Sequence, residues 1–92
     1  NLQDLHKLKV GESVGECMSS DLDVELGGRQ TLIEGVKLCE ASADFVTREL
    51  LQAILTDTEE HIDFLETQLN LLKSLGEQNY LQSAMGEMEG EG

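Results

Sequence analysis

Two side chains with ligand chemistry stand at apolar positions of this sequence. Glu25 lies at helical spacing between Leu22 and Leu32, and His61 precedes Leu65 by one helical turn. A carboxylate in such a setting would carry a heavy desolvation cost if nothing compensated its charge. Because carboxylate oxygens and imidazole nitrogens both bind metal ions, the pair predicts a metal site if the fold brings the two residues together.

Simpler roles for both residues remain open. Arg29 follows Glu25 by four positions, so an ion pair within one helix could compensate the carboxylate, as could solvent at the edge of the fold. A single histidine on an apolar face is commonly a core residue whose nitrogens are hydrogen-bonded. The choice between these roles and a metal site depends on the elements that carry them.

Helical signals dominate the chain, which contains no proline and shows no sustained alternation of apolar and polar residues. Ser13 and Glu16 form a capping-box pattern, which predicts a helix over residues 14–41 after a lead-in loop over 1–13. Ser42 or Asp44 can cap a second helix over 45–75, and Gly76 can end it. We expect a short third helix over 77–85 and a mobile acidic tail over 86–92.

Glycines at three positions interrupt the pattern of the first helix: Gly27, Gly28 and Gly35. Each costs a helix interior about 1 kcal/mol relative to alanine. They weaken the helix in isolation, or they permit close approach of a neighbour.

An all-α fold follows, with a long antiparallel helical hairpin and a short C-terminal helix. Each long helix should be more than ~40 Å long, at a rise of 1.5 Å per residue. Its apolar face is too broad for one partner helix to cover. The sequence therefore predicts half of a four-helix bundle. With a turn near Ser42, Glu25 and His61 fall at similar heights along the hairpin and can face each other.

Composition excludes several kinds of partner. The chain has 19 acidic and 6 basic residues and a formal net charge of −13, which disfavours nucleic acids and anionic membrane surfaces. It has no apolar run of membrane-spanning length, so we expect a cytoplasmic protein.

Cys17 and Cys39 lack the spacing of a metal or disulfide motif and should be reduced. Because the chain begins at Asn1, we expect a fragment or a processed polypeptide.

Four segments resemble the C-terminal half of a bacterioferritin, in the family's order: NLQDLHKLKVGESV, DLDVEL, TEEHIDFLETQLNLLKSLG and QNYLQ. The resemblance covers nearly all of residues 1–92 and implies a single partial ferritin-like domain, made of the third, fourth and fifth helices. In this family twenty-four subunits form a shell that stores iron, oxidises ferrous iron at a di-iron centre within each subunit, and binds heme between subunits. It therefore implies iron and other bacterioferritin subunits, of the same or another type, as partners.

Carried over by residue, the resemblance assigns Glu25 and His61 as metal ligands from the third and fourth helices. It also exposes a departure at Thr58, where the family has the glutamate that bridges the two irons. A neutral hydroxyl supplies neither a bridge nor a charge, so the di-iron site should be defective. Asp57 could replace the lost ligand, although an acid there in the family more plausibly faces the iron-storage cavity.

Other polar and sulfur-bearing residues carry weaker expectations. The family's heme-ligating methionine lies on the second helix, so Met18, Met85 and Met88 should not ligate heme, although heme is possible in the parent assembly. Asn79 and Gln82 match residues that line pores between subunits, and a solvated helix face is an equal reading.

Two functions remain open, the first implied by the resemblance and the second by the residues alone. The first is bacterioferritin-type iron storage and ferrous iron oxidation, in which this chain is an incomplete subunit. Ferroxidase activity then belongs to the complete assembly, and the chain alone should be inactive. The alternative is a non-catalytic helical interaction or assembly module, in which Glu25 and His61 only specify how helices pair.

Overall fold

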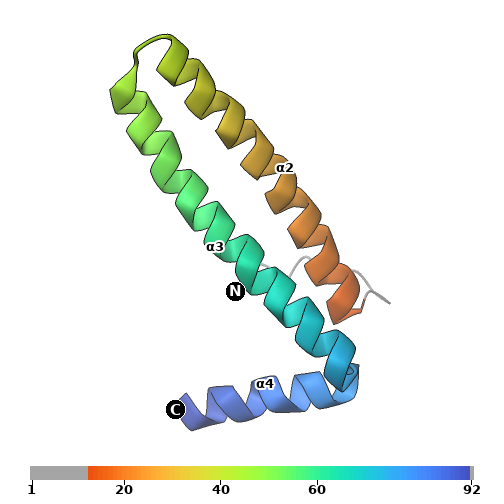
Figure 1. Ribbon diagram of the computed structural model, residues 1–92. Coiled ribbons are helices and arrows are strands. Elements are labelled where there is room, and N and C mark those ends of the chain that lie inside the picture. Colours follow the sequence, from red (N-terminus) through yellow and green to blue (C-terminus); the bar gives the residue numbers. More distant parts are fainter. Residues whose placement is uncertain (1–12, 92) are drawn as a thin grey trace.

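Three helices make up the part of the chain that the structure describes. The computed structural model describes residues 13–91, and side chains over residues 13–86. The helices are α2 (Val14–Ala41), α3 (Phe45–Leu75) and α4 (Glu77–Glu91), and these described residues contain no strand. Figure 1 shows α2 and α3 as an antiparallel hairpin, from which α4 turns sharply away. The predicted all-α class and the predicted bounds of the two long helices are confirmed.

The start of α2 follows from local chemistry. Oγ of Ser13 accepts a hydrogen bond of 3.1 Å from the backbone N–H of Glu16 and donates one of 3.2 Å to the Glu16 carboxylate. The serine thus satisfies one of the backbone donors that every helix leaves unpaired at its first turn. The capping pattern in the sequence is sufficient to place this boundary.

The turn between the long helices shows which of Ser42 and Asp44 caps α3. Asp44 is the N-cap of α3 and accepts a hydrogen bond of 3.2 Å from the Thr47 N–H, whereas Ser42 ends α2. Ala43 has a left-handed φ of 57°, and its N–H donates to the Glu40 carbonyl, while the Asp44 N–H donates to the Cys39 carbonyl. This pair of bonds is the Schellman arrangement, which satisfies the last carbonyls of α2 and reverses the chain.

The end of α3 confirms the predicted role of Gly76, whose φ is 79°. The phenol of Tyr80 then donates to Gln68 Oε1, and the Val14 N–H donates at 3.4 Å to the Glu77 carboxylate, so α4 is tied to both long helices. The expected end of this helix at residue 85 is wrong, because α4 continues to Glu91. Glutamate and methionine are good helix formers, which favours helix where we expected a tail.

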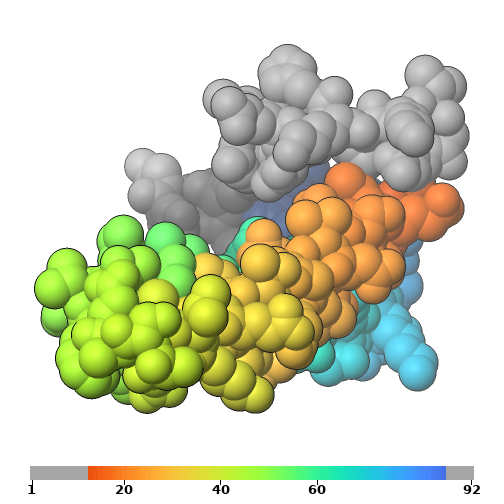
Figure 2. All heavy atoms as spheres, turned by 90° about the horizontal axis from the view of Figure 1, so that it is seen from above, coloured from red at the N-terminus to blue at the C-terminus, as the bar shows by residue number. Residues whose placement is uncertain are grey.

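Packing between α2 and α3 leaves a thin core. Three apolar side chains are buried among the described residues: Cys39, Ile62 and Leu65. Figure 2 shows α2, in orange and yellow, as part of one elongated body with α3. The two cysteines of the chain lie far apart on α2 and form no disulfide. No described helix is long and apolar enough to cross a membrane.

At two glycines of α2, a leucine side chain of α3 lies against the helix backbone. A Cβ on Gly15 would lie 2.9 Å from Leu72 Cδ2, and a Cβ on Gly35 would lie 3.1 Å from Leu51 Cδ1. The predicted close approach is therefore confirmed at Gly35. At Gly27 and Gly28 a Cβ would meet nothing within 4 Å among the described residues, so no described helix approaches α2 closely there.

Candidate metal centre

Glu25 and His61 meet across the hairpin, as their heights along the two helices predict. Oε1 of Glu25 lies 3.6 Å from Nδ1 of His61. The Glu25 side chain is 27% exposed and that of His61 is 46% exposed, so the pair stands at the edge of the α2–α3 contact and opens to one side. At 3.6 Å the contact is too long for a hydrogen bond, and an ion pair requires protonated His61.

The position of the ring is set by α3 itself. Phe64, one turn beyond His61, stacks on the imidazole with ring centroids 6.5 Å apart and an interplanar angle of 25°. Since the Phe64 side chain is 56% exposed, it flanks the imidazole without closing the site. The ring thus has Phe64 on one side while its Nδ1 atom faces Glu25.

A second cross-helix pair lies beside the first. Arg29 Nε donates at 3.3 Å to Oε1 of Glu59, and both side chains are about half-exposed. The proposed compensation of Glu25 by Arg29 within α2 is therefore wrong, because the guanidinium turns to the carboxylate on α3. The sequence interpretation missed this pair, although Glu59 stands two residues before His61 and could have been placed by the same height argument.

The remaining candidate ligands do not complete a centre within one chain. Thr58 is half-buried and lies one turn before His61, and Asp57 is exposed. Among the side chains of residues 13–86, no three of histidine, cysteine, aspartate or glutamate are grouped closely enough to hold a metal ion. The described part of the chain thus brings together two candidate ligands and no third.

These two donors nevertheless fit one metal ion. Ligand atoms that each lie ~2.1 Å from a divalent cation can be at most ~4.2 Å apart. The observed 3.6 Å between Glu25 Oε1 and His61 Nδ1 falls within that limit. An oxygen and a nitrogen donor also match what iron, manganese and zinc accept. The pair can supply two ligands of a site whose other ligands would come from outside this hairpin.

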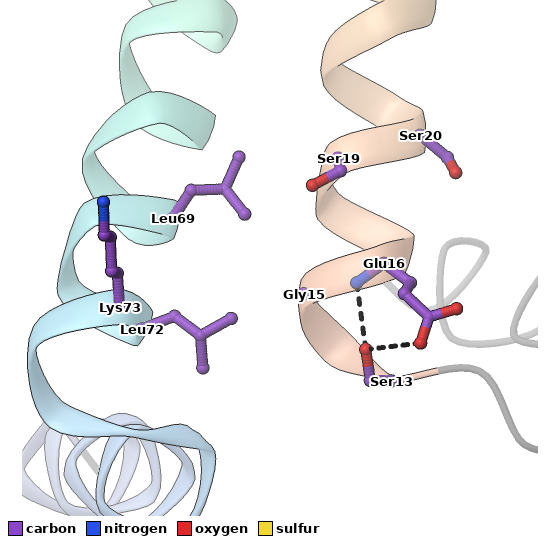
Figure 3. A pocket seen from close by; sticks show the side chains of 8 residues that line it. All are labelled: Ser13, Gly15, Glu16, Ser19, Ser20, Leu69, Leu72 and Lys73. Atoms are coloured by element: carbon purple, nitrogen blue, oxygen red, sulfur yellow. Dashed lines mark hydrogen bonds between the residues drawn. The ribbon is translucent and has the colours of Figure 1, made fainter.

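One hollow on the hairpin surface lies away from Glu25 and His61. It has a volume of about 600 Å³ and is formed near the start of α2 and the end of α3 by Ser13, Gly15, Glu16, Ser19, Ser20, Leu69, Leu72 and Lys73. In Figure 3, Leu69 and Leu72 point from α3 toward the serine-bearing turns of α2. Its polar lining is mostly hydroxyls, and it contains neither Glu25 nor His61. It therefore adds no ligand to the candidate metal centre.

Comparison with known proteins gives one family throughout. Residues 1–75 match the model of the ferritin-like domain. The chain is 46% identical over 80 residues to a bacterial ferritin of Neisseria meningitidis serogroup B, an alignment that covers 86% of this chain and 52% of that protein. It is 42% identical over 82 residues to a bacterioferritin of Brucella melitensis, an alignment that covers 89% of this chain and 51% of that protein.

A third relative extends the match toward the C-terminus. The bacterioferritin of Streptomyces coelicolor is 39% identical over 89 residues, which is 97% of this chain and 53% of that protein. The chain spans about half the length of the curated relatives that it matches. On the match over residues 1–75 and the three-helix fold, this chain belongs to the ferritin-like family.

Proposed function

We propose that this chain is an incomplete bacterioferritin-type subunit that contributes to iron storage and ferrous iron oxidation in a shell of twenty-four subunits. Glu25 and His61 are its metal ligands, and Thr58 makes its di-iron site defective. One observation carries this proposal: Glu25 Oε1 and His61 Nδ1 lie 3.6 Å apart, within reach of one cation. The relatives named bacterioferritin support the class of protein.

The charges of the chain are compatible with iron as the stored substrate. A formal net charge of −13 attracts ferrous ions. A hollow of about 410 Å³ between α2 and α3 is lined by Glu59, Asp63 and Glu66 and by Arg29, which pairs with Glu59. Carboxylate oxygens suit hard cations. One chain, however, supplies a single carboxylate and a single imidazole at the candidate centre, so it should not oxidise iron rapidly by itself.

Anaerobic titration with ferrous iron, followed by exposure to oxygen, tests this proposal. We expect weak binding and slow oxidation by the 92-residue chain, and binding that weakens further in Glu25→Gln and His61→Asn. Glu34→Gln is the matched control, because Glu34 lies nine residues from Glu25 and so on the opposite side of α2. Two tightly bound irons per chain with rapid oxidation would contradict the proposed defect.

The alternative is a non-catalytic helical interaction or assembly module. Its basis is the contact between Glu25 and His61, which joins α2 to α3 at 3.6 Å. Iron content per chain and particle mass distinguish the two functions. A large iron-containing particle supports storage, whereas a small metal-free oligomer, whose association changes in Glu25→Gln, supports the interaction module.

A further inference from the structure

We draw no further inference here: the strongest candidate, the hollow between α2 and α3 lined by Glu59, Asp63 and Glu66, is a cluster of acidic side chains in which Arg29 already pairs with Glu59, and no second, independent observation among the described residues points to a ligand there.

Discussion

The phenol of Tyr80 in α4 donates a hydrogen bond of 2.7 Å to Oε1 of Gln68 in α3. The bond is partly buried and joins two helices that meet at the single residue Gly76. Because it spans this joint, it helps to set the direction in which α4 leaves the hairpin, together with the hydrogen bond from the Val14 N–H to Glu77.

Removing this bond should loosen α4. We expect Tyr80→Phe to cost about 0.5–1.5 kcal/mol in the docking of α4, since the ring is kept and only the hydrogen bond is lost. Amide hydrogen exchange of α4 measures the effect. A double-mutant cycle with Gln68→Leu should give a coupling energy of similar size, whereas strictly additive effects would show that the bond contributes nothing.

Ala43 occupies a backbone conformation that suits glycine. Its φ of 57° is left-handed, which costs a residue with a Cβ ~1–2 kcal/mol. Ala43→Gly should raise the free energy of unfolding by about 0.5–1 kcal/mol, after allowing for the greater entropy of unfolded glycine. Urea denaturation measures the change. Ala41→Gly, inside the last turn of α2, should instead destabilise, and equal effects of the two variants would contradict the turn geometry.

Gly27 and Gly35 should respond differently to the same substitution. A Cβ at Gly27 meets nothing within 4 Å among the described residues, so Gly27→Ala should gain close to the full ~1 kcal/mol of helix propensity. A Cβ at Gly35 lies 3.1 Å from Leu51 Cδ1, so Gly35→Ala should gain less or lose stability. Thermal unfolding compares the two variants. A larger gain at Gly35 would show that the α2–α3 contact is looser than the structure has it.

The cap of α3 should make stability depend on pH in the acidic range. Hydrogen bonds from the side chain and backbone of Thr47 lower the pKa of Asp44 below its ordinary value of 3.8. A lowered pKa means that the ionised form favours the folded state. Its stabilising contribution is therefore fully present above pH 3.8 and is lost as the pH falls through the lowered pKa.

Asp44→Asn is the matched variant for this test, because asparagine also caps helices but does not titrate. The stability of the unmodified chain relative to Asp44→Asn should be constant at neutral pH and decline in the acidic range. Thermal unfolding as a function of pH measures the difference. A difference that stays constant down to the lowest pH would contradict the lowered pKa.

Restoring a carboxylate at position 58 should strengthen metal binding. Thr58→Glu adds an acid one turn before His61 on α3, and we expect affinity for Co²⁺ to rise about tenfold, equivalent to ~1.4 kcal/mol. Calorimetric titration measures the affinity. Thr56→Glu adds the same charge away from His61 and controls for the general attraction of cations. Equal gains in the two variants would contradict the role of position 58.

Local chemistry in the sequence determined much of this structure. The bounds of α2 and α3 follow from Ser13, Asp44 and Gly76, because caps satisfy backbone groups within a few residues of the helix end. The meeting of Glu25 and His61 followed from helix rise and the position of the turn, which together set the height of every residue on the hairpin. Neither inference required knowledge of how the helices are rotated.

Only the tertiary structure decided how the helices are rotated about their axes and how α4 docks on the hairpin. Arg29 pairs with Glu59 of α3 rather than with Glu25 of its own helix. This outcome depends on how each helix is turned about its axis, on which the spacing of residues along one helix gives no information. The direction of α4 likewise depends on a hydrogen bond between residues 12 positions apart in the sequence. Contacts between helices therefore set the side-chain pairs and the direction of α4, which local propensity leaves undetermined.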